Sequence, residues 1–236
     1  MGKIFDPVFM INSVPEILRA LPITLLLAVS SMAVGLIIGV VVALIRYFRV
    51  RGLAQIAKVY VSFIRGTPAL VQIMLVYFGI PLTLRAVNAY WGTELNINGV
   101  PREFFAVVAL SLNAGAYMSE TVRGALQSVD IGQIEAAYSI SMTVSQAMRR
   151  IVIPQAFAAA IPALANTLVS LIKETSLVFT ISIVDLMAQA RIVGSRGYRF
   201  FEIYVVISLI YWAISTVISR GLSFAEKAAR KHERSF

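Results

Sequence analysis

Five long runs without a charged residue constrain the fold of this 236-residue chain more than any other feature. They hold 26, 19, 16, 22 and 17 residues and cover 20–45, 66–84, 104–119, 151–172 and 203–219. A helix needs roughly 20 apolar residues to cross a bilayer core of about 30 Å, so each run approaches the length of a span. Apolar residues make up 58% of the chain and charged residues 14%, against about 45–50% and about 25% in soluble domains. The sequence therefore predicts an all-α, polytopic membrane protein.

The predicted membrane domain is a single unit over 1–236. Its five transmembrane helices cover 20–45, 59–84, 104–121, 155–175 and 203–220. The runs are continuously apolar and do not alternate, which favours helices over a barrel because a helix satisfies its own backbone groups in lipid. A further apolar stretch at 175–184 is too short to span, so it is either re-entrant or an extension of the fourth helix. The first run is too long for the apolar part of a signal peptide, and we expect none to be cleaved.

Composition also limits the chemistry and the orientation. The chain has no cysteine and one histidine, His232, which excludes thiolate and multi-histidine metal sites within one chain. The net charge of +9 indicates basic cytoplasmic loops rather than nucleic acid. Segments 46–58, 120–150 and 220–236 hold twelve Lys and Arg, and segments 1–19, 85–103 and 173–202 hold eight. We therefore expect the N-terminus outside, the C-terminus in the cytoplasm, and lipid around the spans.

The predicted cytoplasmic segment 122–154 is too long and too patterned for a simple connector. It contains two short helical patterns, and Thr143 with Gln146 forms a capping box before the second. Val144, Ala147, Met148 and Ile151 then recur with helical spacing. The product is either an amphipathic hairpin that closes the bundle or a docking surface for another protein.

Several polar residues lie within or beside the predicted spans, where charge is costly and is kept for function or pairing. Arg65 and Glu120 sit at similar cytoplasmic depth, so they form an ion pair, or Glu120 faces a translocation cavity and meets a substrate ammonium group. Asn113 and Asn166 either line that cavity or hydrogen-bond between helices. The candidate substrate path comprises Arg65, Thr67, Gln72, Asn113, Tyr117, Glu120, Asn166, Lys173, Glu174, Thr175 and Ser176.

Four motifs together resemble the permease subunits of bacterial ABC importers for polar amino acids. They are EAA at 135–137, followed by Ser141 and Pro154; FIRGTP at 63–68; SLNAGAYMSE at 111–120; and LIKETSL at 171–177. The family usually has Gly at the position of Ser141. The stretches around 195–202 and 208–212 look most like the cystine-type members. In this family the 122–154 loop is the coupling element, here Glu135, Ala136, Ala137, Ser141, Met142, Arg149 and Pro154.

The resemblance implies import of a polar amino acid, with cystine or a basic amino acid favoured, across the bacterial inner membrane by alternating access. It implies two ATP-binding subunits that hold ATP and Mg²⁺, a second permease that is identical or homologous, and an extracytoplasmic binding protein. The chain itself has no phosphate-binding G-x-x-x-x-G-K-[ST] motif, so we expect no ATP hydrolysis and no cofactor in it. The alternatives are a self-sufficient ion-coupled carrier or channel, with Glu120, Lys173 and Glu174 as ion sites, and a membrane scaffold.

Overall fold

The computed structural model describes residues 6–94, 96 and 99–233. All regular secondary structure in these residues is helical. Within these residues there is no strand, which confirms the all-α prediction. Along the chain come α1 (Pro7–Leu18), α2 (Leu21–Tyr47), α3 (Leu53–Gly66), α4 (Ala69–Trp91), α5 (Arg102–Gln127), α6 (Ile131–Ser139), α7 (Val144–Ala147), the π-helical turn η1 (Met148–Val152), α8 (Ile153–Glu174), the 3₁₀ segment η2 (Thr175–Ile181), α9 (Leu186–Gly197) and α10 (Phe200–Glu233).

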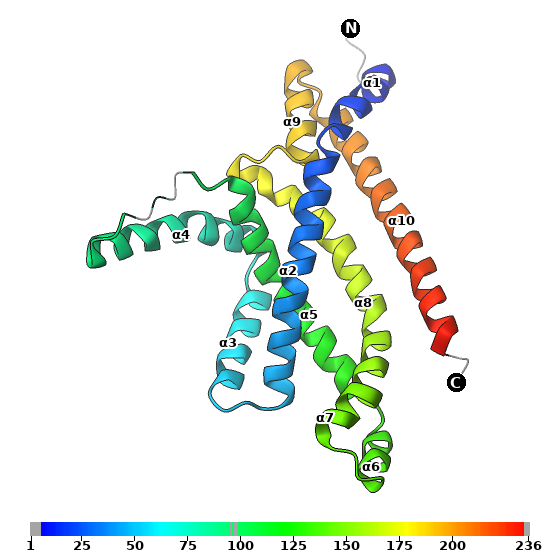
Figure 1. Ribbon diagram of the computed structural model, residues 1–236. Helices are drawn as coiled ribbons and strands as arrows, with labels where there is room; N and C mark the ends of the chain where they lie inside the picture. Colours follow the sequence, from blue (N-terminus) through cyan, green and yellow to red (C-terminus); the bar gives the residue numbers. More distant parts are fainter. Residues whose placement is uncertain (1–5, 95, 97–98, 234–236) are drawn as a thin grey trace.

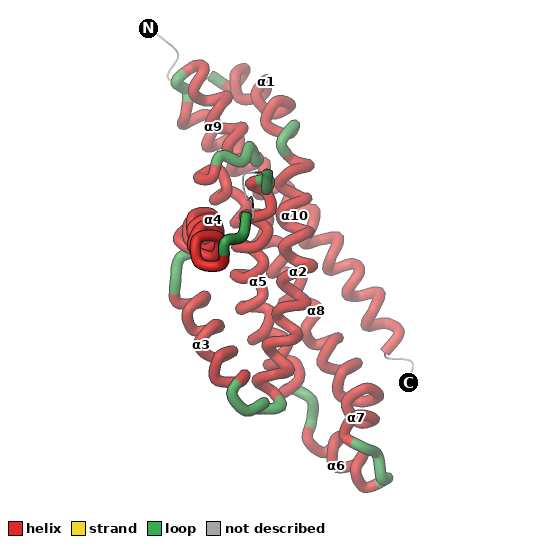
Figure 2. The backbone as a smooth tube through the Cα atoms, turned by 60° about the vertical axis from the view of Figure 1, so that its left-hand side comes forward, coloured by secondary structure: helices red, strands yellow, loops and turns green. Residues whose placement is uncertain are grey.

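The bundle is organised around α5, which packs against α2, α3, α4 and α8 (Figures 1 and 2). Small residues let α2 and α5 approach closely. A Cβ atom on Gly35 would stand 3.1 Å from the Cβ atom of Ala114, and one on Gly115 would stand 2.8 Å from Cγ2 of Ile38. The Gly35-x-x-x-Gly39 spacing is therefore a helix-packing motif.

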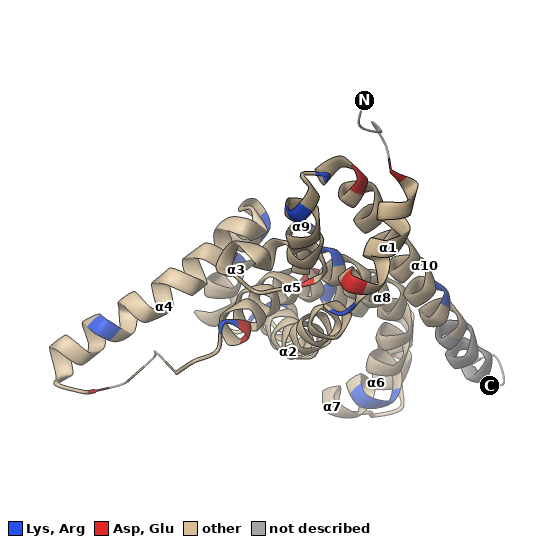
Figure 3. Ribbon diagram, turned by 90° about the horizontal axis from the view of Figure 1, so that it is seen from above, with Lys and Arg blue, Asp and Glu red and all other residues tan. Residues whose placement is uncertain are grey.

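The predicted second span over 59–84 is wrong as a single helix, because the chain breaks between α3 and α4. Thr67 is extended, with φ −121° and ψ 148°. The ring of Pro68 disfavours a helical conformation for the residue before it, and Pro68 has no N–H to continue the helix. As a result α4 leaves the bundle and projects sideways from it (Figures 1 and 3).

Four segments in the described part of the chain are long and apolar enough to cross a membrane. They are Leu21–Tyr47, Ala69–Trp91, Val144–Ile181 and Phe200–Phe224. The 26-residue α5 is long enough but is less apolar, since its centre holds Ser111, Asn113 and Ser119. The protein is thus polytopic, and the count of five spans stays a prediction.

One end of the molecule holds α1 and α9, which the sequence did not predict as helices (Figure 1). Arg196 pairs with Glu16 at 2.6 Å and Arg199 with Asp6 at 3.5 Å, so ion pairs tie α1 to the α9 region. The stretch at 175–184 begins as η2, which continues α8 as far as Ile181 before Ser182 turns the chain with φ 63°. Of the two sequence alternatives, the structure therefore shows an extension of the α8 helix.

The segment 122–154 forms two helices at the opposite end of the bundle (Figure 1). Gln146 N–H donates to Thr143 Oγ1, and Thr143 N–H donates to Gln146 Oε1, which confirms the capping box. Asp130 caps α6, which places Glu135 in the middle of that helix. Both helices are held by local hydrogen bonds and project from the packed spans.

Candidate functional site

A cavity of about 310 Å³ lies between α5 and α8, near the lower limit for small-molecule sites. It brings together four residues of the predicted substrate path, Asn113 and Tyr117 from α5 and Asn166 and Glu174 from α8. The other lining residues are Ala114, Ala163, Thr167, Ser170 and Leu171. Glu174 is the one charged group among these described lining residues, so the cavity combines one carboxylate with amides and hydroxyls.

Thr167 and Ser170 also line the cavity, although neither belongs to the predicted substrate path. They lie four and seven residues after Ala163, and Glu174 follows Ser170 by four, so all four positions share one face of α8. Ser170 lies four residues from both Asn166 and Glu174, and Thr167 lies seven residues before Glu174. Helical spacing from the two predicted residues therefore indicates both positions.

Tyr117 connects the cavity to Arg65 at the end of α3. The guanidinium carbon of Arg65 lies 5.5 Å from the centre of the Tyr117 ring, within the range of a cation–π contact. Both side chains are exposed in this single chain. Arg65 therefore lies beside the cavity wall, although it is not among the residues that line it.

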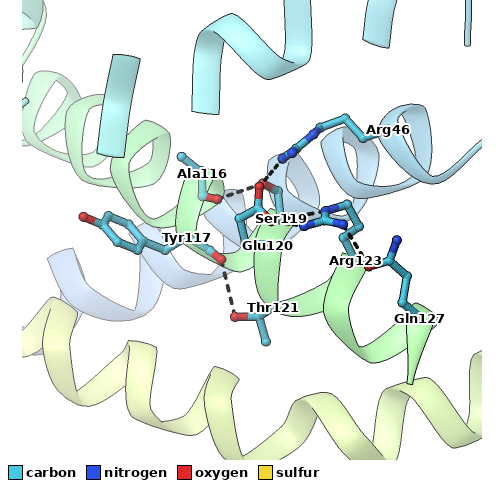
Figure 4. Close-up of polar contacts among 8 residues, drawn as sticks. All are labelled: Arg46, Ala116, Tyr117, Ser119, Glu120, Thr121, Arg123 and Gln127. Carbon is cyan, nitrogen blue, oxygen red and sulfur yellow. Dashed lines mark hydrogen bonds and ion pairs between the residues drawn. The ribbon is translucent and has the colours of Figure 1, made fainter. Parts of the chain in front are cut away.

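The predicted pairing of Glu120 with Arg65 is wrong, because Glu120 binds two other arginines. It pairs with Arg46 at the end of α2 and, at 2.6 Å, with Arg123 one turn further along α5. Arg123 also donates to Gln127 Oε1 at 2.8 Å. Figure 4 shows this cluster, with the Tyr117 ring extending away from it. Glu120 is not among the residues that line the cavity.

Five other residues of the predicted path also lie outside the cavity lining, Ser176 among them. Gln72 is 4% exposed and accepts a hydrogen bond from Asn113 Nδ2. Thr67 donates to Phe63 O at 2.9 Å, and the buried Thr175 donates to Ile172 O at 2.7 Å. Lys173 is exposed on α8.

Ser176, the last residue of the predicted path, is half-buried at the start of η2 and also lies outside the lining. Thr175 and Ser176 stand where the α-helical geometry of α8 changes to the 3₁₀ geometry of η2.

Most of the predicted coupling residues in segment 122–154 are exposed. Glu135, Ala136, Ser141, Arg149 and Pro154 are exposed, whereas Met142 is half-buried and Ala137 is buried. Exposed apolar side chains lie beside them, with Ile131 71%, Ile140 73% and Val144 55% exposed. We call the protruding helices α6 and α7 the knuckle. Because the knuckle exposes apolar and charged side chains, it can dock into a cleft of a partner protein.

The polytopic helical fold, the polar cavity and the protruding knuckle together define a membrane permease. A family profile described as "Binding-protein-dependent transport system inner membrane component" matches residues 35–231. The chain belongs to this family of inner-membrane transport components. It is therefore the multi-pass permease component of an ABC importer and not the ATP-hydrolysing subunit.

Two curated relatives align over nearly the whole chain. The probable amino-acid permease protein YxeN of Bacillus subtilis (strain 168) is 40% identical over 226 residues, which cover 96% of each chain. The L-cystine transport system permease protein TcyL of the same organism is 34% identical over 233 residues, 99% of this chain and 95% of the relative.

Among solved structures, "Crystal structure of an amino acid ABC transporter with histidines" superposes with a TM-score of 0.81 and 34% identity. The match covers 96% of this chain and 100% of the chain in the solved structure. Membership of the family implies ATPase and substrate-binding partners. It does not favour the ion-coupled carrier that the sequence left as an alternative.

Proposed function

We propose that the chain moves a polar amino acid across the membrane and that the cavity between α5 and α8 is part of the path. The observation that carries the proposal is Glu174, which adds a carboxylate to the amides of Asn113 and Asn166 in one cavity. An amino acid brings an ammonium group, which a carboxylate and amide oxygens can bind. The similarity to a cystine permease and to a transporter solved with histidines supports this substrate class.

Within that class we favour L-cystine or a basic amino acid. The sequence offered Glu120 as a partner for the substrate ammonium group, and its pairing with Arg46 and Arg123 removes it from that role. Glu174 takes its place, because the described lining offers one negative charge and no positive one. A second amino group or a guanidinium on the substrate would gain from that charge.

We further propose that the α6–α7 segment couples transport to two ATP-binding subunits, which hold ATP and Mg²⁺. Binding and hydrolysis of ATP by these subunits would move the knuckles together and apart, and the cavity would open alternately to each side of the membrane. An extracytoplasmic binding protein would deliver the amino acid. With the N-terminus outside and the C-terminus in the cytoplasm, α6 and α7 face the ATPases, while α1 and α9 face the binding protein.

A second permease, identical or homologous, completes the proposed path. The apolar α4 supports it: this helix projects from the bundle, carries Arg85 as its one charged residue, and buries Gln72 and Ile73 against the rest of the described chain (Figure 3). An apolar helix that buries so few of its side chains within its own chain needs lipid or another protein around it.

Co-purification tests the coupling proposal. The native chain and Glu135→Arg would each be expressed with a candidate ATPase from the same source, and we expect the substitution to remove the ATPase from the purified complex. Glu94→Arg makes the same charge change at an exposed position outside the knuckle and should retain the ATPase. Retention of the ATPase by Glu135→Arg would contradict the docking assignment.

Vesicle transport tests the path and the direction. Proteoliposomes of the complete transporter should take up labelled L-arginine or L-cystine in an ATP-dependent manner, and Glu174→Gln should lower the rate. Transport that runs only outward would refute import. An unchanged rate in Glu174→Gln would remove the cavity from the path.

A further inference from the structure

Gln72 joins the break between α3 and α4 to the wall of the cavity. It lies in the first turn of α4 and is 4% exposed. Its Nε2 donates to Ile64 O at 2.7 Å, to Thr67 O at 3.0 Å and to Thr67 Oγ1 at 2.9 Å. The last carbonyl groups of a helix lack partners within it, so Gln72 caps the end of α3 from the next helix.

These acceptors fix which way the Gln72 amide points. A main-chain carbonyl oxygen can only accept a hydrogen bond, so the nitrogen of the amide must face Ile64 and Thr67. The oxygen must then face α5, where Oε1 accepts from Asn113 Nδ2 at 2.8 Å. The orientation follows from the chemistry of the partners and needs no further assumption about amide flips.

The orientation of Gln72 in turn fixes Asn113. Since Oε1 of Gln72 can only accept, Asn113 must direct its NH₂ group toward Gln72. Its carbonyl oxygen Oδ1 lies on the other branch of the amide, and Asn113 is one of the residues that line the cavity with Glu174. Asn113 is 6% exposed, so its amide has little room to turn.

We propose that Gln72 is a positioning residue that holds Asn113 with Oδ1 available to the substrate. This inference rests on the proposed function of the cavity. Two acceptors, Asn113 Oδ1 and the Glu174 carboxylate, then favour the N–H groups of an ammonium or guanidinium. The same arrangement disfavours a substrate with an acidic side chain, because both groups would repel its carboxylate. Gln72 thus sets selectivity without touching the substrate.

Direct binding to the complete permease–ATPase complex in nanodiscs tests the proposal, with tritiated L-arginine and L-cystine as probes and unlabelled L-glutamate as competitor. Gln72→Met keeps the size of the side chain and removes both hydrogen-bonding groups. We expect Gln72→Met and Asn113→Ala each to weaken binding about tenfold, the loss of one hydrogen bond to a charged group. L-glutamate should compete better in both variants than in the native complex.

The double variant separates positioning from general disruption. If Gln72 acts through Asn113, Gln72→Met combined with Asn113→Ala should bind no more weakly than Asn113→Ala alone. Thr83→Val removes a hydroxyl further along α4, at an exposed position where Thr83 donates to Gly79 O, and it should retain native affinity. A further loss in the double variant, or an equal loss in Thr83→Val, would overturn the positioning role.

Substrate binding by Glu174→Gln shows whether a failed prediction concerns only the positioning role of Gln72 or also the proposed function of the cavity. If Glu174→Gln weakens binding while Asn113→Ala does not, the positioning inference is wrong and the cavity assignment stands. If neither changes binding, or if the native complex binds neither probe, the proposed path or its substrate class is wrong, and the inference falls with it.

Discussion

Gly39 of α2 lies so close to α5 that a Cβ atom on it would stand 2.8 Å from the Cβ atom of Met118. The backbone oxygen of Gly115 would lie 3.2 Å away on the same side. Neither neighbour is the flexible end of a side chain, so the contact leaves no room for a methyl group. The central pair of helices therefore depends on this glycine for its separation.

Overpacking a tight contact usually costs about 1–3 kcal/mol, and alanine returns about 1 kcal/mol through its higher helix propensity. We therefore expect Gly39→Ala to destabilise the protein by up to about 2 kcal/mol. Melting of the purified protein in one detergent measures the effect. Gly124→Ala is the matched control, because its Cβ atom would meet nothing within 4 Å. A higher melting temperature for Gly39→Ala would contradict the close packing.

A second prediction concerns the ion pairs that Glu120 makes with Arg46 and Arg123. Their side chains are 21%, 15% and 29% exposed, so solvent screens them only in part. Glu120→Gln keeps the shape but removes the charge, and we expect a loss of about 1–3 kcal/mol, as for hydrogen bonds to charged groups. Melting compares it with Glu135→Gln at an exposed position. Equal melting temperatures for the two variants would show that the cluster contributes nothing.

The third prediction concerns Asp185, which is fully buried between η2 and α9. Burial raises the pKa of its carboxyl above the ordinary value of 3.8, although Ala188 N–H and the Tyr211 hydroxyl donate to it. The folded state then holds the proton more tightly than the unfolded state. The contribution of Asp185 to stability is therefore fully present below pH 3.8 and is lost as the pH rises through the raised pKa.

Asp185→Asn should remove this pH dependence, because an amide does not titrate and its oxygen can still accept from Ala188 N–H. The melting temperature of the variant should increase relative to that of the native chain as the pH rises from about 4. Asp130→Asn is the control, since Asp130 caps α6 at an exposed position. A difference between native and Asp185→Asn that stays constant with pH would refute the raised pKa.

Sequence patterns predicted the fold where local chemistry decides it. Charges bracket the apolar runs, so α2, α8 and α10 follow the predicted spans, and the spacing of Thr143 and Gln146 identified a real capping box. Pro68 is visible in the sequence, but the sequence does not show whether a helix resumes in the same direction after a proline. The direction of α4 depends on contacts with α5 and η2 that lie far away in the chain.

The cavity was predicted in part for a similar reason. Asn113, Tyr117 and Glu120 share a face of α5 by spacing, yet Glu120 turns to Arg46, which is 74 residues away. Spacing within a helix defines a face, whereas the partner of a long side chain depends on which helix packs there. The sequence could therefore identify Glu174 as a candidate but not show that it, rather than Glu120, lines the cavity.

The last prediction uses Ser141, which ends α6 with a φ of 61°. Its N–H donates to Tyr138 O at 2.9 Å, and Met142 N–H donates to Ala137 O at 3.0 Å, which together form a Schellman motif. Glycine is favoured at this left-handed position, where a residue with a Cβ atom costs roughly 1–2 kcal/mol. The structure thus explains why serine strains the turn between the two helices of the knuckle.

Ser141→Gly should therefore slow hydrogen exchange of the amides in α6, with a gain of about 1 kcal/mol in local stability. Ser139→Gly makes the same chemical change two residues earlier, inside α6, where the Ser139 hydroxyl donates to Glu135 O. That control should speed exchange, because glycine weakens a helix by about 1 kcal/mol. Opposite effects of the two substitutions follow only if residue 141 is left-handed in solution. Faster exchange in both variants would place Ser141 within a continuous helix and remove the turn from the knuckle.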